Sequence, residues 1–149
     1  MKTATIPPIR VAPDFRLELE GVLVQTMHAG IAEVLVGYRH SREVGPVVIL
    51  GLGGRFAELS ERRVVRCAPL SLDTARSMID ELPALRLLRG FRNRPAGDIE
   101  ALAETLHKLS LLALVEDPCV VEAEINPLIV RITGVVAVDA LARIETVTR

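Results

Sequence analysis

Three polar side chains interrupt the otherwise apolar stretch VEAEINPLIV, residues 121–130. Glu122, Glu124 and Asn126 stand at two-residue intervals, and side chains at such intervals project from the same face of a β-strand. Pro127 biases Asn126 toward extended backbone, which favours a strand through this position. The spacing therefore predicts a row of oxygen-bearing side chains where a buried strand ends.

A third carboxylate is predicted to join this row from the next strand. The dipeptide Thr133-Gly134 favours a two-residue hairpin loop. With that loop, Asp139 of the returning strand would lie opposite Leu128. Leu128 shares a face with Asn126 by strand alternation, so Asp139, Asn126 and Glu124 are predicted to converge at one end of the hairpin.

Such oxygen-only groups suit Mg²⁺, which is six-coordinate and is often held by one or two protein oxygens together with phosphates and water. A bound cation would also offset the repulsion between the carboxylates. The alternative is that these acids simply face water, as acids at strand ends usually do, and Glu122 fits that alternative best. A magnesium site is therefore a hypothesis for Glu124, Asn126 and Asp139.

Other candidate positions are less specific. The run GLGGRF, residues 51–56, matches neither a dinucleotide-binding fingerprint nor a P-loop. Its glycines either let a phosphate or acyl group approach the backbone or form a tight turn. Glu33 interrupts an apolar strand, where it either faces water or contacts a ligand. His28 follows a strand end and is placed to line a site. Neither a Ser-His-Asp nor a Cys-His arrangement can be argued from the sequence.

The composition narrows the class of protein. A chain of 149 residues suits one domain, and its core must be aliphatic, because half of the residues are hydrophobic but only 3% are aromatic. A net charge of −1 provides no field that would attract nucleic acid or a membrane surface. There is no signal-like or membrane-spanning apolar run. Two separated cysteines favour reduced thiols, and we expect a cytoplasmic protein.

Apolar runs rich in Val, Leu and Ile with short spacers predict mostly antiparallel strands. The predicted strands are residues 21–27, 31–40, 46–54, 62–70, 119–126, 128–132 and 135–144. One helix is predicted over residues 72–82 with Ser71 as N-cap, and a longer one follows the N-cap Asp98. Residues 84–97 suggest one helical turn and a loop, and residues 1–20 an extended arm. The fold class is therefore α+β, with helices on a mostly antiparallel sheet.

Several segments resemble the ATP-grasp domain of NDP-forming acyl-CoA synthetases, a family that includes acetyl-CoA and succinyl-CoA synthetase β-type chains and acetyltransferases carrying this domain. The resemblance covers Gly21 to Ile144 and rests on GVLVQTM, AEVLVG, GPVVILGLGGRFAEL, RCAPLS, EINPLIV and VVAVDA, in the family's order and near its spacing. It implies that residues 21–149 form the C-terminal lobe, which is half of an ATP-grasp fold.

The resemblance also implies roles for individual residues. The backbone of Gln25, Thr26 and Met27 would contact adenine, with Gln25 standing where the family often has Glu. His28 and Glu33 match further nucleotide-contact positions. Asn126 and Asp139 match the two magnesium ligands, and Glu124 is the adjacent acid. The implied ligands are Mg²⁺ with ATP or ADP.

The chain departs from the family in two ways. The family's N-terminal lobe, with its phosphate-binding lysine and glycine-rich loop, has no counterpart in these residues, and neither has the CoA-binding domain with its phosphorylated histidine. Arg62 and Arg63 stand where the family tends to carry an acid. The resemblance thus implies a nucleotide-binding part of a synthetase that interconverts acyl-CoA, ADP and phosphate with acid, CoA and ATP, without turnover by itself. Its partners would be the remaining domains or a subunit of such an enzyme.

Two other interpretations remain open. The chain could be a non-catalytic remnant that binds a partner or a nucleotide for regulation. That interpretation predicts an exposed apolar lobe face and a possible homodimer through it. It could also be a purely structural sandwich, which predicts no response to a magnesium nucleotide.

Overall fold

The computed structural model describes residues 24–54, 62–90, 92, 95–116 and 119–145. Within them, six strands form one antiparallel sheet. The strands are β1 (Ala32–Ser41), β2 (Gly45–Leu52), β3 (Arg63–Cys67), β4 (Cys119–Val130), β5 (Val135–Ala137) and β6 (Ala140–Glu145). The order is β3-β2-β1-β4, and β5 and β6 both pair with β4 on its far side. The predicted antiparallel pairing is confirmed.

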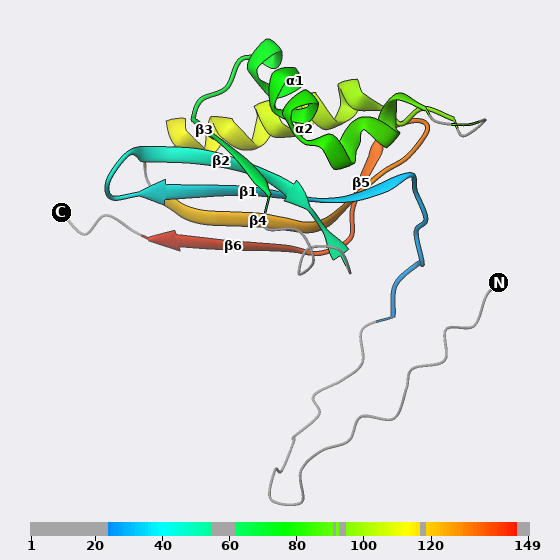
Figure 1. The fold of residues 1–149 in the computed structure, drawn as a ribbon. Coiled ribbons are helices and arrows are strands. Elements are labelled where there is room, and N and C mark those ends of the chain that lie inside the picture. The colour runs from blue at the N-terminus through cyan, green and yellow to red at the C-terminus, as the bar shows by residue number, and fades with distance from the viewer. Residues whose placement is uncertain (1–23, 55–61, 91, 93–94, 117–118, 146–149) are drawn as a thin grey trace, which may run out of the picture.

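All the described helices cover one face of this sheet, and no described helix lies on the other face (Figure 1). They are α1 (Leu72–Glu81), the 3₁₀ helix η2 (Pro83–Arg89), α2 (Ile99–Ser110) and the 3₁₀ helix η3 (Leu111–Leu114). This arrangement is the predicted α+β class. Within the described residues, no helix is both long and apolar enough to cross a membrane.

Both predicted N-caps are confirmed. Ser71 Oγ accepts a 3.1 Å hydrogen bond from the Thr74 N–H, and Asp98 Oδ1 accepts a 2.9 Å bond from the Ala101 N–H. These bonds satisfy backbone donors that a helix start leaves without partners. Helix α1 ends one residue earlier than predicted, with Leu82 in an extended conformation.

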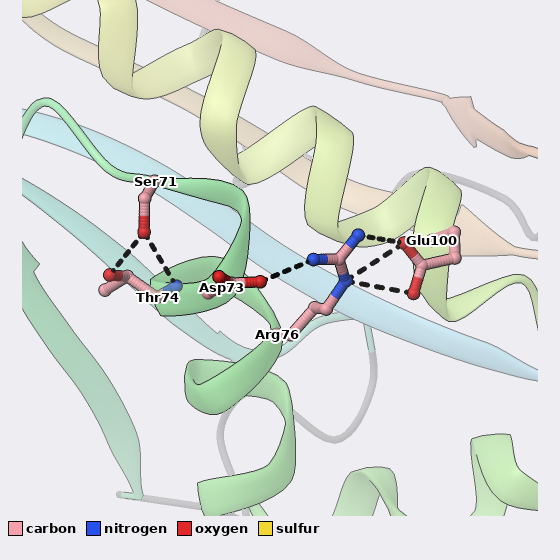
Figure 2. A network of polar contacts seen from close by, with 5 residues as sticks. All are labelled: Ser71, Asp73, Thr74, Arg76 and Glu100. Carbon is pink, nitrogen blue, oxygen red and sulfur yellow. Dashed lines mark hydrogen bonds and ion pairs between the residues drawn. The ribbon is translucent and has the colours of Figure 1, made fainter.

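An arginine links the two α-helices (Figure 2). Arg76 of α1 donates to both carboxylate oxygens of Glu100 on α2, at 2.7–3.1 Å, and to Asp73 in its own helix at 2.7 Å. The Arg76 guanidinium holds the pKa of the Glu100 carboxyl below its ordinary value. This pair lies on the surface, so it fixes the relative placement of α1 and α2 more than it stabilises the fold.

Strand alternation places the core on the helix side of the sheet. Val34, Val36 and Tyr38 of β1 are almost fully buried and belong to the same cluster as Leu102 and Leu106 of α2. The residues between them along β1 must therefore point to the helix-free face. This alternation decides which side chains can take part in a site on that face.

Several predicted strand boundaries are wrong, and the predicted strand 62–70 ends at Cys67. Residues 24–27 are not a strand: all of residues 24–30 are exposed and without regular secondary structure, because no described strand lies beside residues 24–27 to share their backbone hydrogen bonds. The predicted strands 119–126 and 128–132 form the single strand β4, and the predicted strand 135–144 is divided into β5 and β6. Residues 21–23 and the predicted arm 1–20 lie outside the described residues.

Candidate functional site

The turn between β4 and β5 lies one residue earlier than predicted. Val130 pairs with Val135, and the Arg131 N–H donates a 3.1 Å hydrogen bond to the Gly134 carbonyl, so the two-residue loop is Ile132-Thr133 and not Thr133-Gly134. The N-terminus of α2 holds this turn. Asp98 Oδ2 accepts a 2.7 Å hydrogen bond from the Gly134 N–H, and the Asp98 N–H donates a 2.8 Å bond to the Arg131 carbonyl. The bonds that Asp98 accepts, led by the one from Gly134, hold the pKa of its carboxyl below the ordinary value.

This turn shifts Asp139 along the hairpin by two residues. Leu128 pairs with Ala137, so the predicted pairing of Leu128 with Asp139 is wrong. Asp139 instead lies opposite Asn126, and the Asn126 N–H donates a 3.1 Å hydrogen bond to the Asp139 carbonyl. The two predicted magnesium ligands are therefore closer along the strands than the sequence indicates.

The prediction that Leu128 shares a face with Asn126 is wrong, because Leu128 is buried in the helix-side core, whereas Asn126 bonds Glu124 on the other face. The register of β4 against β1 shifts between Val34 and Val36, and this irregularity interrupts the alternation.

The Asn126 carboxamide is held from both sides. Its Nδ2 donates a 3.2 Å hydrogen bond to Glu124 Oε1, and its Oδ1 accepts a 3.2 Å bond from the Gly54 N–H. Glu124 pairs with Gly37, whose neighbours along β1 point into the core. The Glu124–Asn126 pair therefore lies on the helix-free face of the sheet.

A glycine pair at the end of β2 brings Glu33 to the same place. The Gly53 N–H donates a 3.0 Å hydrogen bond to the Glu33 carbonyl. A Cβ atom added to Gly54, whose φ is +58°, would lie only 1.6 Å from Glu33 Oε2. The Glu33 carboxylate therefore lies against Gly54, and the N–H of this same glycine bonds Asn126. The sequence singles out this glycine run but does not indicate its contact with Glu33 and Asn126.

Asn126 with the bonded Glu124 and the opposite residue Asp139 is called the Asn126 group. The structure does not bring the predicted adenine-contact segment to this group. Gln25, Thr26, Met27 and His28 are exposed in the chain that leads into β1 (Figure 1), and they make no hydrogen bond to any other described residue. Where this segment joins β1, residues 29–31 and 131–133 line an open hollow of about 700 Å³. Only Glu33, among the predicted nucleotide contacts, lies beside the Asn126 group.

Two further charged side chains among the described residues, those of Glu122 and Arg63, have other neighbours on this face. Arg143 Nε of β6 lies 3.9 Å from Glu122 Oε2, so Glu122 has an ion-pair partner at the rim of the sheet. Arg63 pairs with Gly51, and its Cγ lies 3.4 Å from the position of a Cβ on that glycine. The Arg63 side chain therefore crosses the face beside β2, while Arg62 is exposed just before β3.

A Cys-His contact that the sequence did not indicate lies at the opposite end of β4. Cys119 Sγ is 3.8 Å from His40 Nδ1, because the antiparallel pairing of β1 with β4 brings these distant positions together. The contact borders a groove of about 890 Å³ that Arg42 and Arg143 also line. It is separate from the Asn126 group.

The donor chemistry of the Asn126 group fits a hard cation. Within the described residues, no three His, Cys, Asp or Glu side chains gather closely enough to hold a metal ion. The Asn126 carboxamide instead bonds one carboxylate, that of Glu124, and Asp139 lies opposite on the returning chain, bonded through its backbone. Such a set suits Mg²⁺, which commonly takes few protein ligands and fills its other positions with phosphate oxygens and water.

The comparison with protein families matches residues 10–144 to the ATP-grasp domain. The chain belongs to the ATP-grasp family. The resemblance seen in the sequence is thereby confirmed, and the six-stranded antiparallel sheet with helices on one face is part of an ATP-grasp fold.

Relatives of this ATP-grasp chain include enzymes that form acyl-CoA. An ADP-forming acetate–CoA ligase from Archaeoglobus fulgidus is 37% identical over 83% of this chain, which spans 18% of that protein. The β subunit of an ADP-forming acetate–CoA ligase from Pyrococcus furiosus is 38% identical over 83% of this chain, which spans 53% of that subunit.

A solved structure is similar as well. It is acetyl-coenzyme A synthetase 1 of Candidatus Korarchaeum cryptofilum in complex with coenzyme A and Mg-AMPPCP. The TM-score is 0.71 and the sequence identity 37%, and the match covers 80% of this chain and 55% of that chain. The chain thus spans about half or less of these ATP-grasp relatives, which contain further domains or belong to enzymes with more than one subunit.

Proposed function

We propose that the chain is the nucleotide- and magnesium-binding C-terminal lobe of an NDP-forming acyl-CoA synthetase, with residues 21–149 as the lobe. The whole enzyme would interconvert acyl-CoA, ADP and phosphate with the acid, CoA and ATP. The observation that carries the proposal is the Asn126 carboxamide held between Glu124 and Gly54, with Asp139 directly opposite. Family membership and the printed activities of the relatives support it.

In this proposal, Asn126 and Asp139 hold Mg²⁺, and Glu124 is the adjacent acid. Glu33 and His28 contact the nucleotide. The backbone of residues 25–27 contacts the adenine, and the hollow where this segment joins β1 offers room beside it. The helix-free face of the sheet then faces the nucleotide.

The share of this chain in the chemistry is binding and orientation. Magnesium, when bound, neutralises phosphate charge during phosphoryl transfer. Glu124 fixes the plane of the Asn126 carboxamide, and the hairpin fixes Asp139 next to it. The residues that would complete phosphoryl transfer and bind CoA belong to other domains or to a partner subunit. We therefore expect no turnover from this chain by itself. We also expect a cytoplasmic location.

Calorimetric titration with ADP, with and without Mg²⁺, tests the proposal. We expect heat that depends on Mg²⁺ and that Asn126→Ala removes. The matched control is Ser77→Ala, an exposed position on α1 far from the Asn126 group. If the chain alone gives no heat, the titration is repeated with the N-terminal lobe of a relative added in trans. Absence of Mg²⁺-dependent heat there as well would overturn the proposal.

One observation favours partner binding through the same face. Val65 and Leu141, which share the helix-free face with Glu124, are 46% and 69% exposed. A non-catalytic, partner-binding lobe would use such a surface, and so would a homodimer. Sedimentation velocity distinguishes them from the main proposal. A dimer that Leu141→Glu disrupts, together with an absence of nucleotide binding, would favour the alternative.

A further inference from the structure

We propose that Gly54 is a positioning residue of this site, which orders a nucleotide-side carboxylate and a metal-side carboxamide at once. The proposal rests on the proposed function and adds a residue to which the sequence resemblance gives no role. Gly54 contacts both Glu33 and Asn126, which are far apart in the sequence.

The first contact is a hydrogen bond. The Gly54 N–H donates to Asn126 Oδ1 at 3.2 Å, while Asn126 Nδ2 donates to Glu124 at 3.2 Å. These two bonds fix the carboxamide in one orientation. Because a carbonyl oxygen has two lone pairs, one lone pair of Oδ1 remains for a cation. A ligand group held in this way loses little freedom when the cation binds.

The second contact, with the Glu33 carboxylate, is possible only because glycine has no side chain. A Cβ on Gly54 would lie 1.6 Å from Glu33 Oε2 and 2.8 Å from Glu33 Cδ. Since the carboxylate ends a flexible side chain, an alanine at position 54 would displace the Glu33 carboxylate and not the backbone. The backbone φ of +58° at Gly54 is a second reason for glycine, because residues with a side chain seldom adopt a positive φ. Gly54 thus reserves the place that the Glu33 carboxylate occupies.

Gly45 provides a matched control for the backbone effect. Its φ is +77°, and a Cβ added there would meet nothing within 4 Å. Gly45→Ala and Gly54→Ala therefore share the cost of a left-handed alanine, but only Gly54→Ala displaces Glu33. We expect both variants to lower Tm by similar amounts. We expect Gly54→Ala to weaken Mg-ADP binding about 10- to 100-fold, as loss of an outer positioning contact does, and Gly45→Ala by less than about twofold.

A double substitution shows whether Glu33 is the cause. In the Glu33→Ala background, the added methyl group has no carboxylate to displace, so Gly54→Ala should weaken Mg-ADP binding by less than about twofold. The same loss with and without the Glu33 carboxylate would overturn this part of the proposal. Equal losses in Gly45→Ala and Gly54→Ala would overturn the positioning role altogether.

Amide hydrogen exchange tests the other contact without any ligand. Asn126→Ala removes the acceptor of the Gly54 N–H, and we expect exchange at Gly54 to rise at least about tenfold. The neighbouring Gly53 N–H, which bonds the Glu33 carbonyl at 3.0 Å, should keep its rate. Unchanged exchange at Gly54 would overturn the contact.

Amide exchange at Gly54 and the binding of Mg-ADP together separate the role of Gly54 from the proposed function. Faster Gly54 exchange in Asn126→Ala, without any Mg²⁺-dependent binding by the wild-type chain either alone or with the added N-terminal lobe, would leave the contact in place and remove the proposed function. Mg²⁺-dependent binding that Gly54→Ala and Gly45→Ala affect equally would keep the proposed function and remove the role of Gly54.

Discussion

Asn126 and Asp139 lie opposite each other across the β4–β5 hairpin, joined by a 3.1 Å hydrogen bond from the Asn126 N–H to the Asp139 carbonyl. This bond uses backbone atoms only, so it occupies no polar atom of either side chain. It also means that substitution of either side chain leaves the backbone link intact. The effects of such substitutions on ligand binding can therefore be separated from effects on the fold.

Asp139→Ala should remove Mg²⁺-dependent nucleotide binding with little effect on stability. The Asp139 side chain is exposed, and substitutions at such positions usually change the free energy of unfolding by no more than about 0.5 kcal/mol. Titration with ADP with and without Mg²⁺, together with thermal unfolding, measures both effects. Glu43→Ala, which removes an exposed carboxylate in the β1–β2 turn, is the control. Retention of the full Mg²⁺ effect in Asp139→Ala would show that Asp139 is not a ligand.

Asn126→Asp should make the stability of the chain depend on Mg²⁺. The substitution replaces the Nδ2 group that donates to Glu124 with a second carboxylate at hydrogen-bonding distance. Repulsion between the two carboxylates should lower Tm in EDTA, and Mg²⁺ should restore more stability in the variant than in the wild type. Adding Glu124→Gln should relieve the loss in EDTA. Equal Mg²⁺ effects in variant and wild type would argue against a cation at this position.

The contribution of Asp98 to stability should disappear in acid. The ordinary pKa of an aspartate is about 4, and the Gly134 and Ala101 N–H groups hold the pKa of Asp98 below it. A lowered pKa in the folded state means that the contribution is complete above the ordinary value and is lost as the pH falls through the lowered one.

The Tm difference between wild type and Asp98→Ala, measured from neutral pH down into strong acid, checks this prediction. The difference should be largest at neutral pH and should shrink in acid. Asp98→Asn keeps an acceptor oxygen that does not titrate, so its difference from Asp98→Ala should not shrink in the same way. A constant difference between wild type and Asp98→Ala over the whole range would contradict the assignment.

Ser110→Ala should destabilise the chain by about 1–3 kcal/mol, because it leaves a buried donor without its acceptor. Ser110 is fully buried on α2, accepts a 2.8 Å bond from the Leu70 N–H and donates a 2.6 Å bond to the His107 carbonyl. Chemical denaturation measures the loss. Ser77→Ala, an exposed serine on α1, should stay within about 0.5 kcal/mol of the wild type. Equal effects of the two substitutions would show that the Ser110 bonds add no net stability.

Local sequence signals were enough for most of the fold. The helix starts at Ser71 and Asp98 follow from capping chemistry within three residues of each position. The antiparallel order of β1, β2 and β3 follows from apolar runs with short spacers. The shared face of Glu124 and Asn126 follows from strand alternation. Each of these features depends on residues close together in the chain, whose types and order are all that a sequence displays.

Tertiary contacts decided the rest. The β4–β5 turn is centred on Ile132-Thr133 and not on the predicted Thr133-Gly134, and Asp98, 36 residues from Gly134, holds it there through bonds to Gly134 and Arg131. Residues 24–27 are not a strand, because a strand needs a neighbour for its backbone groups and no described strand lies beside them. Gly54 bonds Asn126 from 72 residues away. Hydrogen bonds over such separations depend on how the whole chain packs, so local residue types determined the elements and packing determined the geometry of the site.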